Sequence, residues 1–127
     1  MNKIITKLFT FFSFFLFFSC NEFQKILRNE DVKIKYEMAE KYYENEEWRR
    51  ASTLFEQIQP KYRGKPQGER ITFFYANSLL NKKNYVLAAF QFESFVKSYP
   101  ISQKVEEAAF NAAYCYYKQS PKHSLDQ

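Results

Sequence analysis

The chain has 127 residues, of which 46% are hydrophobic and 20% aromatic, and its formal net charge is +5. Because the basic residues are interleaved with glutamates and form no long stripe, this charge does not indicate nucleic-acid binding. With two cysteines and one histidine, the composition excludes a disulfide framework and argues against histidine-based catalysis.

Residues 1–19 have the features of a secretory signal peptide. Lys3 and Lys7 precede an apolar stretch that ends at Ser19 and Cys20. The stretch is shorter than the roughly 20 apolar residues that a membrane-spanning helix needs. A basic start, a short apolar core and a small residue at the cut are typical of a cleaved signal. We predict cleavage between Ser19 and Cys20, although a free cysteine after an ordinary signal is the alternative for Cys20.

The cleavage junction resembles bacterial lipoprotein signals, in which a small residue precedes a lipidated cysteine. Ser19 fits that pattern, whereas Phe17 stands where leucine is usual. The resemblance implies that Cys20 carries acyl chains such as palmitate, and a triacylated cysteine meets the need of stable anchoring for at least two lipid signals. Residues 20–31 are then expected to be the lipidated N-terminus and a short tether, with about a dozen residues between Cys20 and the first helix.

A period of 37 residues runs through the remainder of the chain and relates Ala39, Ala76 and Ala113. The same spacing relates large residues at other positions, including Tyr36 with Phe73 and Phe110, Tyr43 with Leu80 and Tyr117, and Phe55 with Phe92. Self-similarity at a fixed spacing of this length is typical of a helical solenoid.

Each repeat resembles the tetratricopeptide motif, in which small residues let two antiparallel helices approach closely. The resemblance implies an all-α, right-handed superhelix of about two and a half repeats over 32–127. The repeats are expected at about 32–65, 66–101 and 102–127, the third being incomplete so that the chain looks truncated. Helices are predicted over 32–45, 47–62, 67–82, 85–99 and 102–119. Asn84 and Ser102 are the predicted N-caps, and Arg63 departs from the helix-ending proline found at Pro100.

Residues suited to catalysis or metal binding are nearly absent from the sequence. His123 lies in a turn after Pro121, without a cysteine, serine or carboxylate at a telling spacing. The glutamates at 44, 46 and 47 are best interpreted as a solvated run at a helix turn, since a metal site needs more ligands. Cys115 is predicted to be a small buried residue on a helix. We therefore expect a binding protein, not an enzyme, with no cofactor and no metal.

The first helices of tetratricopeptide pairs line a concave groove, and family geometry projects aromatic and amide side chains into it. The expected groove residues are Tyr36, Tyr43, Phe73, Asn77, Leu80, Asn81, Phe110, Tyr114 and Tyr117. Rings supply contact area and amides can bond a peptide main chain, so an extended peptide is the expected ligand. The alternative is that these aromatics pack between the repeats.

The lipoprotein cysteine and the segments 51–55, 88–95, 98–100 and 112–118 together resemble the BamD family, the lipoproteins of the outer-membrane β-barrel assembly machine. The resemblance implies a scaffold anchored to the outer membrane by lipid and facing the periplasm. Its implied partners are nascent outer-membrane proteins, the barrel assembly subunit and other assembly lipoproteins, with no nucleic acid. A different periplasmic scaffold, one that coordinates cell-wall processes, is the alternative.

Overall fold

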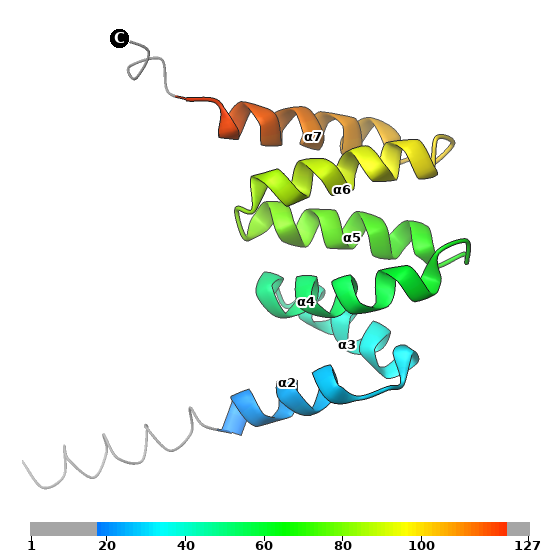
Figure 1. Cartoon of the computed structure of the whole chain (residues 1–127), viewed down its shortest axis with the longest axis vertical. Coiled ribbons are helices and arrows are strands. Elements are labelled where there is room, and N and C mark those ends of the chain that lie inside the picture. The colour runs from blue at the N-terminus through cyan, green and yellow to red at the C-terminus, as the bar shows by residue number, and fades with distance from the viewer. Residues whose placement is uncertain (1–17, 122–127) are drawn as a thin grey trace, which may run out of the picture.

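The computed structural model describes residues 18–121 and consists of antiparallel helices stacked side by side (Figure 1). The helices are α2 (Phe18–Arg28), α3 (Val32–Glu44), α4 (Trp48–Ile58), the 3₁₀ helix η1 (Gln59–Tyr62), α5 (Gly68–Asn81), α6 (Tyr85–Ser98) and α7 (Val105–Gln119). This part of the chain contains no strand, and none of its helices is long and apolar enough to cross a membrane. Residues 1–17, which include most of the predicted signal peptide, lie outside the described part.

Helices adjacent in the chain pack as pairs, α3 with α4 and α5 with α6, and α7 packs on α6. The alanines of the 37-residue period lie where the paired helices meet: Ala39, Ala51, Ala76 and Ala88 are fully buried. Phe55 and Phe92, four residues beyond the second alanine of each pair, fill the core beside them. The predicted all-α, tetratricopeptide-like fold is therefore confirmed.

Two helix ends show how side-chain chemistry sets the boundaries. Asn84 is an N-cap as predicted, because its side chain accepts a hydrogen bond from the Leu87 amide at 3.3 Å. The prediction for Ser102 is wrong, since α7 begins at Val105 and Lys104 occupies the cap position. The Ser102 hydroxyl instead donates to the Glu69 carboxylate at 2.5 Å and accepts from the Lys104 amide at 3.1 Å. It ties the α6–α7 turn to α5.

Residues 20–31, expected to be a tether, contain most of a helix that the sequence analysis missed. Helix α2 lays Phe23, Ile26 and Leu27 against the core, and the Phe23 ring meets the Tyr42 ring edge-on at 5.6 Å. Lys35 Nζ donates to the last turn of α2 at the Leu27 carbonyl, 3.0 Å away. The expected linker before the first helix is therefore wrong, because α2 joins the helix stack. Only the backbone of Cys20 is described, so its lipidation stays a prediction.

The outer face of α7 is uncovered in the described structure. Phe110 and Tyr117 are 70% and 73% exposed, and Ala113 is exposed although its equivalents Ala39 and Ala76 are fully buried. Cys115, on the inner face, is fully buried as predicted, and burial raises the pKa of its thiol. A buried thiol held in its neutral form is a packing residue and not a nucleophile.

Candidate binding groove on the first helices

Aromatic contacts join the first helices of the two complete repeats. The Tyr43 ring of α3 stacks on the Phe74 ring of α5, with centroids 4.1 Å apart and planes inclined by 9°. Asn77 Nδ2 donates to the Tyr43 hydroxyl at 3.3 Å. Burial of this hydroxyl raises the pKa of Tyr43, so the phenol remains neutral in its contact with the amide. A stacked pair of rings therefore joins α3 to α5.

Glu40 also bridges α3 and α5. Its Oε1 accepts from the Tyr36 hydroxyl at 2.6 Å and from Arg70 Nε at 2.8 Å. Burial, followed by the hydrogen bond to Glu40, raises the pKa of Tyr36 to about 12. The Arg70 guanidinium also lies over the Phe74 ring, 4.9 Å from its centroid. The carboxylate therefore holds the Arg70 guanidinium beside the Phe74 ring.

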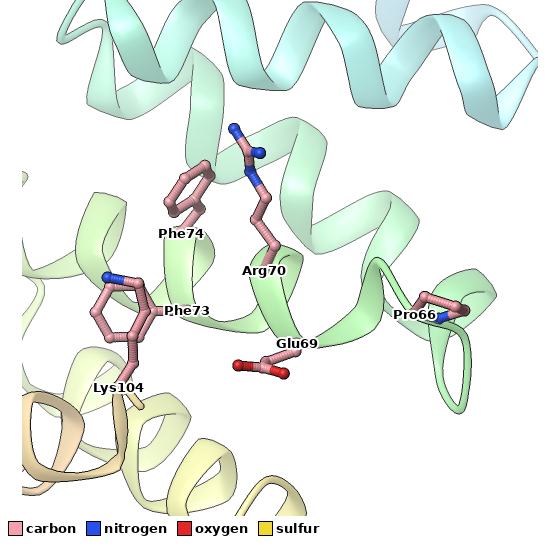
Figure 2. Close-up of a pocket in the computed structure, with 6 residues that line it drawn as sticks. All are labelled: Pro66, Glu69, Arg70, Phe73, Phe74 and Lys104. Atoms are coloured by element: carbon pink, nitrogen blue, oxygen red, sulfur yellow. The ribbon is translucent and has the colours of Figure 1, made fainter. Parts of the chain in front are cut away.

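A cavity of about 440 Å³ opens between the start of α5 and the start of α7. Its lining residues are Pro66, Glu69, Arg70, Phe73, Phe74 and Lys104. Lys104 Nζ lies 4.4 Å from the centre of the Phe73 ring, and Figure 2 shows the lysine crossing that ring while Arg70 and Phe74 lie together on α5. Each ring thus has a cation on its face, a favourable arrangement because aromatic faces are electronegative. We call this the Lys104 cavity.

The predicted groove residues do not share one environment. Tyr36, Tyr43 and Asn77 take part in the α3–α5 contacts described above. Phe73 is only 2% exposed and packs edge-on against Phe95 at 5.3 Å, so it belongs to the core and reaches the Lys104 cavity only as part of the wall. For Phe73, packing between helices is the arrangement that the structure shows.

The other predicted groove residues do not line the Lys104 cavity. Leu80 is partly buried against the core, and Asn81 is exposed with its Nδ2 donating to the Asn77 carbonyl at 2.9 Å. Three more are exposed on α7 and do not line the Lys104 cavity: Phe110, Tyr114 and Tyr117. The groove assignment as a whole stays a prediction.

Arg70, Phe74 and Lys104 were not predicted from the sequence, although a signal for two of them exists. Arg70 and Phe74 lie four residues apart on the helical stripe that continues to Asn77 and Asn81, so the stripe extends toward the start of α5. Lys104 gives no such signal, because its position depends on how the α6–α7 turn folds back onto α5.

Charged and aromatic side chains make up most of the lining of the Lys104 cavity. Within residues 18–121, no group of three or more His, Cys, Asp or Glu side chains is placed to hold a metal ion. The side chains that line the Lys104 cavity are two cations, one carboxylate, two aromatic rings and a proline.

Stacked helix pairs with small residues at their crossings define a tetratricopeptide-like repeat protein. A family model described as YfiO, outer membrane lipoprotein, matches residues 28–126. The chain therefore belongs to this family, the BamD-like outer membrane lipoproteins, as the sequence resemblance predicted. A comparison with curated proteins gives no match.

Proposed function

We propose that this chain is a non-enzymatic scaffold of the outer-membrane protein assembly complex, anchored by lipid on Cys20 and facing the periplasm. Membership of the outer membrane lipoprotein family supports both the location at the outer membrane and the assignment as a lipoprotein. The scaffold receives unfolded outer-membrane proteins on its first helices and brings them to the barrel assembly subunit.

The Lys104 cavity is the observation that carries the substrate part of this proposal. Its walls are aromatic, so an apolar or aromatic side chain of an extended peptide gains contact area there. Arg70 and Lys104 can donate to a peptide carbonyl or terminal carboxylate, and Glu69 can accept from a main-chain amide. An extended segment with alternating apolar side chains presents those side chains on one face and main-chain amides and carbonyls along its edges.

Binding of a synthetic peptide that ends in an aromatic residue tests this assignment. Lys104→Ala is the informative change, because Lys104 is half-exposed and its loss leaves the core intact, whereas Phe73→Ala would unfold part of it. Removing the cation should weaken peptide binding by about threefold to tenfold, measured by fluorescence anisotropy. Lys97→Ala, an exposed lysine on α6 outside this cavity, is the matched control and should leave affinity unchanged. Equal affinities for Lys104→Ala and the unaltered chain would exclude the Lys104 cavity as the peptide site.

A further inference from the structure

A second cavity, of about 640 Å³, lies between η1, the start of α5 and α6. None of its lining residues lines the Lys104 cavity. The volume is in the range of sites that bind small molecules. We call it the Arg63 cavity, after the residue that stands where the next repeat carries a helix-ending proline.

A partly buried hydrogen-bond network forms one wall of the Arg63 cavity. Gln59 Nε2 donates to Gln91 Oε1 at 3.0 Å and to Thr72 Oγ1 at 3.3 Å, and Thr72 Oγ1 donates to the Gly68 carbonyl at 2.8 Å. Gln91 is only 9% exposed, and its Nε2 has no hydrogen-bond partner among the described residues. Within residues 18–121, every fully buried polar side-chain atom has a hydrogen-bond partner. Because this amide nitrogen has none, it is not fully buried, and it faces the cavity that Gln91 lines. Gln91 therefore presents a free donor to whatever occupies the space.

The next repeat junction lacks these polar groups. At the next junction, 37 residues on, Val96 replaces Gln59 and Ala109 replaces Thr72. Burying amides and hydroxyls costs free energy unless every group is hydrogen-bonded. Val96 and Ala109 carry no hydrogen-bonding side-chain groups, so the polar set beside Arg63 is particular to the junction between α4 and α5.

The remaining walls of the Arg63 cavity supply hydrogen-bond donors and a ring, but no negative charge. None of its lining residues is acidic, and Arg63 is exposed and makes no ion pair among the described residues. Ser94 and Tyr99 add hydroxyls that have no hydrogen-bond partner within residues 18–121. Phe90, which is 62% exposed, places a ring at the edge of the cavity.

We propose that the Arg63 cavity binds a phosphorylated sugar. The Arg63 guanidinium pairs with two phosphate oxygens, a geometry for which its planar fork is suited. The amide of Gln91 and the hydroxyls of Ser94 and Tyr99 bond the sugar hydroxyls, while the Phe90 ring packs against the sugar face. The same chemistry is offered by a soluble sugar phosphate and by the phosphorylated sugar headgroup of a lipid.

Titration of the full-length lipoprotein in detergent micelles with glucose 6-phosphate tests the proposal by nuclear magnetic resonance. Saturable shifts are expected at the Gly64 amide and the Gln91 side-chain amide. Glucose alone and inorganic phosphate alone should each bind about tenfold more weakly, because each lacks half of the recognised groups. Absence of saturation, or equal binding of glucose, of phosphate and of the sugar phosphate, would overturn the proposal.

Two arginine variants separate this site from general attraction to positive charge. Arg63→Gln should weaken binding of glucose 6-phosphate by about tenfold. Arg49→Gln removes an exposed arginine of α4 that does not line the cavity and should change nothing. Equal weakening by both variants would overturn the proposal.

A vesicle measurement identifies the source of the ligand. Phosphatidylinositol phosphate added to phosphatidylcholine vesicles that carry the lipoprotein should lower the apparent affinity for glucose 6-phosphate if the headgroup enters the Arg63 cavity. An unchanged affinity would assign the cavity to the soluble ligand.

Discussion

Burial controls the titration of Tyr75, which lies on α5 with 3% of its surface exposed. Burial, and then the nearby Glu56 carboxylate, raise the pKa of its phenol from 10.0 to about 12. The unfolded chain therefore loses this proton at lower pH than the folded chain does. The stabilisation is complete below pH 10 and is lost as pH rises toward 12.

The Tyr75→Phe variant should remove this pH dependence. Between pH 10 and pH 12 the free energy of unfolding of the unaltered chain should fall by up to about 2 kcal/mol more than that of the variant. Urea unfolding at several pH values measures the difference. Parallel pH profiles for the two proteins would show that Tyr75 does not titrate as described.

Residue-level recognition was only partly predictable from the sequence. The resemblance to tetratricopeptide repeats predicted that Tyr43 and Asn77 lie on neighbouring first helices, and the structure joins the two by a hydrogen bond. The sequence pattern could not show that Phe73 turns into the core, because the pattern of a first helix is the same whether a ring faces a groove or a neighbouring helix. The position of Lys104 could not be predicted from the sequence, because it depends on how the α6–α7 turn folds.

At the scale of helices, α5 and α6 begin and end within one residue of their predicted bounds because strong local signals delimit them. Gly68 starts α5, the Asn84 cap starts α6, and a buried alanine fixes each helix against its partner. Helix α2 lacked such signals. It has 11 residues, a length at which an isolated helix is marginal in water, so it depends on packing against α3.

Phe23→Ala tests whether α2 depends on this packing. The change removes the ring contact with Tyr42 and the cation–π contact with the Arg50 guanidinium, 5.5 Å from the Phe23 ring. We expect α2 amides to exchange hydrogen roughly fivefold to thirtyfold faster, corresponding to about 1–2 kcal/mol, while α5 amides are unaffected. Hydrogen exchange with mass spectrometry measures both helices. Gln24→Ala, an exposed position on α2, is the control, and equal exchange in the two variants would contradict the role of Phe23.

Across the whole molecule, positions that are equivalent by the 37-residue period have different surroundings. Ala76, on α5, is fully buried, whereas Ala113 is exposed on α7. Ala76→Leu should cost about 1–3 kcal/mol of stability, because the helices cannot separate without opening the core. Ala113→Leu should cost less than about 0.5 kcal/mol in the chain of 127 residues. Urea unfolding compares them, and equal losses would contradict the arrangement of the stack.

The central claim is that this outer membrane lipoprotein serves the assembly of outer-membrane proteins. Affinity capture of the full-length lipoprotein from crosslinked membranes tests it most directly, with capture of an unrelated lipoprotein as the control. We predict that the barrel assembly subunit is recovered with this protein and not with the control. Its reproducible absence from the captured material would contradict the claim.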